Sequence, residues 1–112
     1  MSLVLQSQLS GIPVKRGKVR DVYDLGETIL FIATDRISAF DYVLPTGIPR
    51  KGEVLTRMSE FWFDQLSVNH HFLTNDLSDL ELPNDTDLKA LAGRSMVVKK
   101  TEVVPIECVV RG

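Results

Sequence analysis

Hydrophobic and polar residues alternate over the first part of the chain. Apolar and charged side chains take turns from Val14 to Asp24, with an interruption at Gly17. The run from Thr28 to Thr34 is almost wholly apolar and rich in β-forming residues, which is typical of a buried strand. Because only a short turn at 25–27 separates the two runs, we predict two adjacent antiparallel strands.

Helical periodicity is clearest from Gly52 to Leu66. Apolar residues recur there at helical spacing on one face, and charged residues occupy the opposite face. The apolar face consists of Leu55, Met58, Trp62 and Leu66. We predict an amphipathic helix that packs this face against the sheet, with Trp62 on the inner side.

The remaining segments complete a predicted α+β fold, an antiparallel sheet with a packed helix. Asp35 to Pro49 has no sustained period, so we expect an ordered loop that apolar side chains tie to the core. The acidic stretch from Asp76 to Asp87 is expected to be a solvated loop, and a helical turn follows from Leu88 to Ala92. Met96 to Lys100 is predicted to join the sheet, and Ile106 to Val110 to form another strand.

Composition narrows the class of protein. The 112 residues suit one domain or a piece of a larger one, with 44% hydrophobic and 25% charged residues. A net charge of −2 argues against a chain that coats nucleic acid, and no apolar run is long enough to cross a membrane. The start lacks the order of a signal peptide, so we expect a cytoplasmic protein. The chain stops within a predicted strand, so we expect a truncated domain.

A first candidate site lies between Arg16 and Tyr23. Glycine at position 17 allows a ligand to approach the backbone closely, because no Cβ intervenes. Free N–H groups there, with Lys18 and Arg20 on one face of the strand and Val19 on the other, would hold a polyphosphate. The alternative is a plain edge strand with its charges in water.

A second candidate site follows the buried strand, from Ala33 to Asp41. Two carboxylates, a hydroxyl and a guanidinium gather there, and loops at strand ends often carry binding groups. The alternative is that Asp35 and Ser38 only cap turns.

The adjacent His70 and His71 suggest a metal site at first sight, but neighbouring strand residues face opposite ways and no third ligand is near. We therefore predict exposed histidines and no metal site.

A third candidate site spans Lys99 to Arg111. Backbone donors and acceptors after a strand can hydrogen-bond the edge of an adenine, with Val103 and Val104 against its faces. Glu107 and Arg111 lie four apart, so on a strand they would share a face. They form either a structural ion pair or a pair of substrate-binding groups.

Taken together, the candidate segments resemble the SAICAR synthetases, the phosphoribosylaminoimidazole-succinocarboxamide synthases. The resemblance covers residues 16–112 in family order and suggests the longer-chain branch of the family. It is carried by Gly17–Tyr23, Ala33–Asp41, Ile48–Gly52, Ser59–Phe63 and Val104–Gly112.

The resemblance implies an ATP-dependent carbon–nitrogen ligase of purine biosynthesis. Such an enzyme joins carboxyaminoimidazole ribonucleotide to L-aspartate, with ATP and Mg²⁺. It also implies an N-terminal ATP-binding domain similar to a protein-kinase small lobe, here residues 1–112, with the C-terminal domain absent. Mg²⁺ would be held mainly by that missing portion. The truncated chain is then expected to be inactive alone and to self-associate through apolar surface that the missing domain covers.

The resemblance also implies roles for individual residues, although it assigns no catalytic residue. ATP would be bound by Gly17, Lys18, Val19, Arg20, Lys99, Thr101, Glu102 and Val103. Ser38 and Asp41 would line the acceptor or aspartate pocket, and Glu107 and Arg111 would face the ribonucleotide. Two alternatives stay open: a kinase-like nucleotide-binding lobe of another transferase, and a β-rich interaction module without a ligand.

Overall fold

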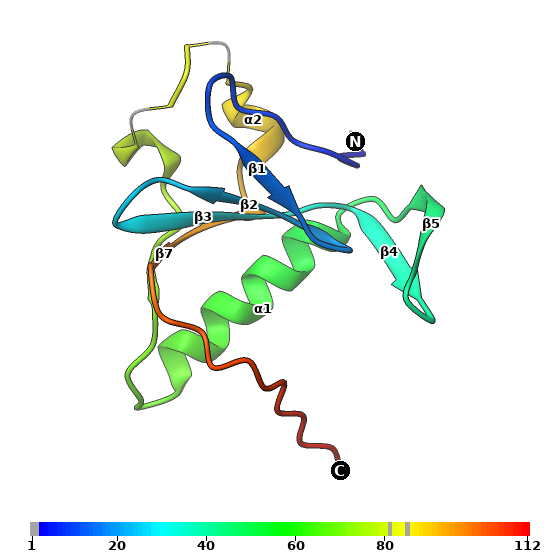
Figure 1. Ribbon diagram of the computed structural model, residues 1–112, viewed down its shortest axis with the longest axis vertical. Coiled ribbons are helices and arrows are strands. Elements are labelled where there is room, and N and C mark those ends of the chain that lie inside the picture. The colour runs from blue at the N-terminus through cyan, green and yellow to red at the C-terminus, as the bar shows by residue number, and fades with distance from the viewer. Residues whose placement is uncertain (1–2, 81, 85) are drawn as a thin grey trace.

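The computed structural model describes residues 3–80, 82–84 and 86–112 and is built around a five-stranded antiparallel sheet (Figure 1). The strand order is β1-β2-β3-β7-β6, and a separate two-stranded ribbon pairs β4 with β5. The strands of the sheet are β1 (Val14–Arg16), β2 (Arg20–Asp24), β3 (Thr28–Ala33), β6 (Phe72–Thr74) and β7 (Ser95–Lys99). The other elements are β4 (Arg36–Ala39), β5 (Tyr42–Gly47), α1 (Lys51–Gln65), the 3₁₀ turn η1 (Leu77–Asp79) and α2 (Leu88–Leu91).

The centre of the sheet confirms the predicted antiparallel pairing. β2 pairs with β3 and β3 with β7, so that Tyr23, Leu30 and Val97 lie side by side in register. All three are almost fully buried, and Leu9, Leu77 and Leu91 complete the core on the same face. Alternation along each strand thus directs one set of side chains into the core, as the sequence pattern predicts.

The predicted single strand from Val14 to Asp24 is instead a hairpin. β1 and β2 pair with each other, and residues 17–19 form the connection between them. Lys18 therefore lies in a turn, and the prediction that it shares a strand face with Arg20 is wrong. Gly17 is the signal for this reversal, because a glycine inside an alternating run commonly marks a bend.

Helix α1 forms where it was predicted, but its apolar face does not pack on the sheet. Trp62 is 52% exposed and Met58 54% exposed, whereas Gly52 and Thr56 are buried. Of the predicted inner face, Met58, Trp62 and Leu66 are therefore exposed, whereas Leu55 lines a hollow between α1 and the sheet. The helix approaches β3 so closely at Gly52 that a side chain there would meet the Ala33 backbone.

The segment from Asp35 to Pro49, expected to be a loop, contains the β4–β5 ribbon. Phe40 and Asp41 both have positive φ (51° and 65°), which is the backbone of a two-residue hairpin turn with the twist that strands favour. Figure 1 shows this ribbon projecting from one end of the sheet. Phe40 is 95% exposed and Tyr42 76% exposed, so these two side chains do not tie the segment to the core.

A buried carboxylate joins three distant parts of the fold. Asp35 accepts hydrogen bonds from the Val4 N–H (2.9 Å), the Gly52 N–H (3.0 Å) and the Arg94 guanidinium (2.8 Å). Arg50, the residue before helix α1, makes no side-chain cap hydrogen bond. Asp35 therefore caps the helix from outside it, where the first N–H groups need acceptors.

The acidic stretch after β6 is only partly solvated. Helix α2 occupies Leu88–Leu91, which confirms the predicted helical turn. Leu77 is buried, however, and Leu80 and Leu82 pack against the core as half-buried residues. Glu81 and Asp85 lie outside the described residues. Leu77, Leu80 and Leu82, which lie between the acidic residues, therefore pack this stretch against the core.

The chain from residue 100 to residue 112 is extended and exposed, and it forms no strand. The predicted strand from Ile106 to Val110 is therefore wrong for this structure. Alternating apolar residues form a strand only beside a partner, and this tail runs away from the sheet (Figure 1). Among the described residues, none of the helices is long and apolar enough to span a membrane.

Candidate functional site

The turn between β1 and β2 has its carbonyl oxygens held by donors of the protein itself. Gly17 N–H donates to Arg20 O (2.7 Å) and closes the turn. Val19 O accepts from both the backbone N–H (3.0 Å) and the hydroxyl (2.7 Å) of Thr34. The turn is thereby fixed to the start of the segment that follows β3.

Arg36 is the second anchor of this turn. Its guanidinium donates to Gly17 O (3.0 Å), Lys18 O (3.1 Å) and Arg20 O (3.3 Å), and also to the carboxylate of Asp21 (2.9 Å). The Arg36 side chain is only 11% exposed. The sequence analysis assigned Arg36 no role, because nothing in the chain's pattern shows that residues 16 to 19 positions apart will meet.

Two backbone N–H groups of the turn remain free. Within the described part of the chain, the N–H groups of Lys18 and Val19 have no acceptor in the protein. Lys18 is exposed, Val19 is half-buried, and the side chain of Arg20 follows directly. Consecutive free N–H groups beside two cations suit an anion.

The structure brings two predicted sites together at this point. Lys18 Nζ donates to the Asp41 carboxylate, which links the β1–β2 turn to the tip of the β4–β5 ribbon. The hydrogen bond from Lys18 lowers the pKa of Asp41, so the carboxylate is charged at neutral pH. Both side chains are exposed, so this ion pair adds little stability. An ammonium group has three donors, and Lys18 can therefore meet an anion while keeping Asp41.

A half-open apolar surface adjoins the turn on the sheet face opposite the core. Val22 and Phe31 pair across β2 and β3 there and are only half-buried. The guanidinium of Arg20 lies 5.1 Å from the centre of the Phe31 ring, a cation–π contact. A hollow of about 280 Å³ opens nearby, lined by Val19, Arg20, Ala33 and Met96 from the sheet region and by Leu55, Thr56 and Ser59 from α1. The sequence analysis missed this surface.

The other predicted ATP residues lie at the far end of the sheet. Lys99 is paired with Thr28, whereas Arg20 is paired with Ala33 at the opposite end of β3. Ser95, which pairs with Ile32 beside Ala33, marks the Arg20 end of β7. From Ser95 to Lys99 the strand spans about 13 Å at roughly 3.3 Å per residue. Thr101, Glu102 and Val103 follow Lys99 as exposed, extended chain. The predicted residues thus form two groups spread along one sheet.

The predicted substrate residues are also separated. Ser38 is half-buried on β4, opposite Val43. Glu107 and Arg111 lie in the exposed tail, and among the described residues neither forms an ion pair or a side-chain hydrogen bond. The predicted alternative of a structural Glu107–Arg111 pair is therefore absent from this structure.

The two histidines contact aromatic rings. The ring of Phe63 lies 4.8 Å from His70 and 5.5 Å from His71, measured between ring centres. Across the described residues, no three histidine, cysteine, aspartate or glutamate side chains gather as metal ligands would.

Asp41 is the exposed carboxylate beside the β1–β2 turn, and one carboxylate can contribute to a Mg²⁺ site that phosphate and water complete.

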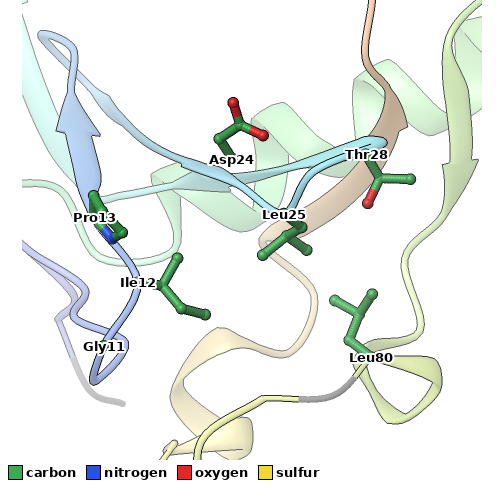
Figure 2. A pocket seen from close by; sticks show the side chains of 7 residues that line it. All are labelled: Gly11, Ile12, Pro13, Asp24, Leu25, Thr28 and Leu80. Carbon is green, nitrogen blue, oxygen red and sulfur yellow. The ribbon is translucent and has the colours of Figure 1, made fainter.

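A second hollow, of about 470 Å³, lies at the end of the sheet away from the β1–β2 turn. Figure 2 shows Ile12, Leu25 and Leu80 converging below the strands, with the Asp24 carboxylate turned away from them. Asp24 is instead paired with Lys100 at 2.7 Å. The hollow is open, and none of the predicted site residues lines it.

A family model and individual relatives all show that the chain is similar to the SAICAR synthetases. The family model described as SAICAR synthetase matches residues 13–112. A phosphoribosylaminoimidazole-succinocarboxamide synthase from Desulforapulum autotrophicum is 51% identical over 112 residues, covering 97% of this chain and 38% of the relative. The synthase of the same name from Desulfosudis oleivorans is 55% identical over 101 residues, covering 88% of this chain and 34% of the relative.

A solved structure shares the fold as well as the sequence. It is the structure described as SAICAR-synthase from Saccharomyces cerevisiae complexed with SAICAR, with a TM-score of 0.80 and 37% identity. The match covers 91% of this chain and 38% of the yeast chain. The present chain thus spans little more than a third of the length of the curated relatives that it matches.

Proposed function

Because the chain belongs to the SAICAR synthetase family, we propose that it forms the N-terminal, ATP-binding part of a ligase of purine biosynthesis. The whole enzyme joins the carboxylate of carboxyaminoimidazole ribonucleotide to the amine of L-aspartate and consumes ATP. The products are SAICAR, ADP and phosphate. The reaction takes place in the cytoplasm, and its partners are small molecules.

The observation that carries the proposal is the β1–β2 turn. Its carbonyl oxygens are held by Thr34 and Arg36, and the N–H groups of Lys18 and Val19 have no acceptor in residues 3–80, 82–84 and 86–112. Lys18 and Arg20 add positive charge at the same place. In our proposal these groups hold the ATP phosphates, since backbone N–H groups and cations together neutralise phosphate charge.

The half-open apolar face next to the turn supports a place for the adenine. Val22 and Phe31 offer flat apolar surface there, and α1 closes one side. In the proposal, Lys99 and the backbone of residues 101–103 lie along the adenine edge, at the end of the sheet away from the phosphates. The separation of the two residue groups along the sheet then suits an ATP molecule bound in an extended conformation.

The likeness to a protein-kinase small lobe is part of the proposal. It is supported by the strand order β1-β2-β3-β7-β6 and by the position of α1 in the chain, between β3 and the last two strands of the sheet. A lobe of this kind works by clamping ATP against a second domain. The exposed apolar side chains of α1, among them Phe61 and Trp62, support the inference that further protein covers them and that the chain alone self-associates.

The chemistry suits this arrangement. A carboxylate resists attack by an amine until a phosphoryl group from ATP converts it into an acyl phosphate. The amine of aspartate then attacks the acyl carbon, the amide bond forms, and phosphate leaves. Mg²⁺, held mainly by the rest of the protein, would neutralise phosphate charge. Lys18 and Arg20 would stabilise the transferring phosphoryl group. Ser38 and Asp41 would line the aspartate pocket, and Glu107 and Arg111 would bind the ribonucleotide.

An assay of the intact protein tests this function. With ATP, Mg²⁺, aspartate and carboxyaminoimidazole ribonucleotide, we expect SAICAR and ADP in equal amounts. The 112-residue chain alone should form neither, because it lacks the second wall of the cleft that positions the reactants. ADP without SAICAR would favour another transferase, and failure of the intact protein to bind ATP would favour an interaction module.

Replacing Lys18 or Arg20 with alanine in the intact protein should weaken ATP binding about tenfold to a hundredfold. Each side chain would lose a charged contact worth roughly 1–3 kcal/mol. Isothermal titration with ATP measures the effect, and circular dichroism should stay native because both side chains are exposed.

Lys89→Ala is the matched control, since Lys89 is an exposed lysine on α2. Its ATP affinity should equal that of the unaltered protein. If both the Lys18 and Arg20 variants also keep full affinity, the turn does not bind phosphate and is a plain sheet edge.

A further inference from the structure

Four of the five side-chain hydrogen bonds of Arg36 go to the β1–β2 turn or to the start of β2. Nη2 donates to Gly17 O (3.0 Å) and Arg20 O (3.3 Å), and Nε donates to Lys18 O (3.1 Å). The two remaining contacts are from Nη2 to Asp21 Oδ1 (2.9 Å) and from Nη1 to Leu5 O (2.7 Å). An arginine fork is rigid and planar, so these acceptors are held in one fixed arrangement.

The orientation of the free N–H groups follows from these contacts. In a trans peptide the carbonyl of one residue and the N–H of the next point in opposite directions. When Arg36 holds the carbonyls of Gly17 and Lys18, the N–H groups of Lys18 and Val19 must point away from the guanidinium. These are the two N–H groups of the turn that have no acceptor among the residues that the structure describes.

We propose that Arg36 is a positioning residue that orients the N–H groups of Lys18 and Val19 toward the phosphates of ATP. It touches no substrate and acts through the backbone of the turn. The inference rests on the proposed function, because it needs a nucleotide at this turn. The turn then meets its ligand already ordered, and binding does not have to fix the loop.

A different role for Arg36 would be to neutralise the buried carboxylate of Asp21. That carboxylate already accepts from the Ser7 N–H (2.8 Å) and hydroxyl (2.7 Å), and Arg16 Nε lies 3.8 Å away. Charge neutralisation needs only one of the five Arg36 contacts. The other four go to backbone carbonyls: those of Gly17 and Lys18 lie in the turn, that of Arg20 lies at the first residue of β2, and the fourth belongs to Leu5.

Arg36→Lys in the intact protein separates the two roles. Lysine keeps the positive charge near Asp21 but cannot reach the carbonyls of the turn together, because its donors lie on one atom. We expect ATP and ADP affinity to fall about tenfold while adenosine affinity stays unchanged, because adenosine has no phosphate. The KM for ATP should rise by the same factor, with kcat and the KM for aspartate unchanged.

The matched control is Arg50→Lys, since Arg50 is exposed and, within the described part of the chain, its side chain pairs with Glu53 and with no residue of the turn. Its affinities should equal those of the unaltered protein. Thermal unfolding of both variants checks that the fold is kept. If Arg36→Lys does not fold, Arg36→Gln keeps two planar donors and is measured in the same way.

Three results would overturn the proposal. Equal losses of ATP and adenosine affinity would make Arg36 a residue of the fold alone. An unchanged ATP affinity in a folded variant would mean that the turn holds its shape without Arg36. If the unaltered protein binds adenosine as tightly as ATP, the turn binds no phosphate, and the proposed ATP site fails together with the role of Arg36.

Discussion

Replacing Asp35 with asparagine is expected to destabilise the chain by about 3–5 kcal/mol, because it removes the hydrogen-bonded counter-charge of the buried Arg94 guanidinium and leaves only the more distant Glu53 carboxylate, 3.9 Å away. Arg94 is 2% exposed and lies 2.8 Å from the Asp35 carboxylate. Asparagine offers one acceptor oxygen where the carboxylate offers two, so the N–H groups of Val4 and Gly52 would also compete for it. A loss of this size is a large share of the stability of a small domain.

Urea unfolding followed by the fluorescence of Trp62, the single tryptophan, measures the change. Asp64→Asn, on the exposed side of α1, is the matched control and should change the free energy of unfolding by less than about 0.5 kcal/mol. A loss below about 1 kcal/mol for Asp35→Asn would mean that water reaches the Asp35–Arg94 pair.

The pH dependence of stability should also report on the contact between Asp35 and Arg94. Burial raises the pKa of Asp35, but the hydrogen bonds from Arg94, Val4 and Gly52 outweigh burial and hold the pKa below its ordinary value of 3.8. A carboxyl whose pKa is lower in the folded state contributes stability that is fully present above pH 3.8 and is lost as the pH falls through the folded pKa. The unaltered chain should therefore lose more stability below pH 4 than Asp35→Asn does.

Gly52→Ala is expected to be the second severe change, at about 3 kcal/mol. A Cβ at Gly52 would lie 2.0 Å from the Ala33 carbonyl oxygen and 2.7 Å from the Arg94 guanidinium. Neither backbone nor buried arginine can yield easily, so α1 must move away from β3. Alanine normally favours a helix by about 1 kcal/mol over glycine, and here the clash reverses that preference.

The control for this change is Gly17→Ala. A Cβ there would meet only Arg20 O at 3.4 Å, an ordinary contact, so the free energy of unfolding should change by less than about 1 kcal/mol. Urea unfolding of the two variants compares them directly. If Gly52→Ala were as stable as Gly17→Ala, α1 would be free to shift on the sheet.

The sequence predicts those elements whose pattern depends on near neighbours. The alternation around Tyr23 and the apolar run around Leu30 identify paired strands. The helical turn at Leu88 is also local, since the Asp87 side chain caps it by accepting from the Ala90 N–H. Periodicity also finds α1, but not its orientation. An apolar stripe shows that one face meets other protein, and it cannot say that the sheet instead accepts the small residues Gly52 and Thr56.

The candidate site is predicted in part for the same reason. Gly17, Lys18 and Arg20 are adjacent in sequence and can be recognised as a group. The anchors Thr34 and Arg36 belong to a different segment, and the ribbon that brings Asp41 to Lys18 was expected to be a loop. Contacts between distant residues depend on chain reversal at Gly17 and at Phe40, and single-sequence patterns locate such reversals poorly.

The Asp35 carboxylate also has a consequence for the order in which the chain folds. Its three partners lie 31, 17 and 59 residues away along the sequence. Closing the longest of these loops costs about 1 kcal/mol more chain entropy than closing the shortest, and none is local. Contacts of this kind form after the hairpins that need only short loops. We therefore expect the loss of Asp35 to speed unfolding more than it slows folding, and so to shorten the lifetime of the native state.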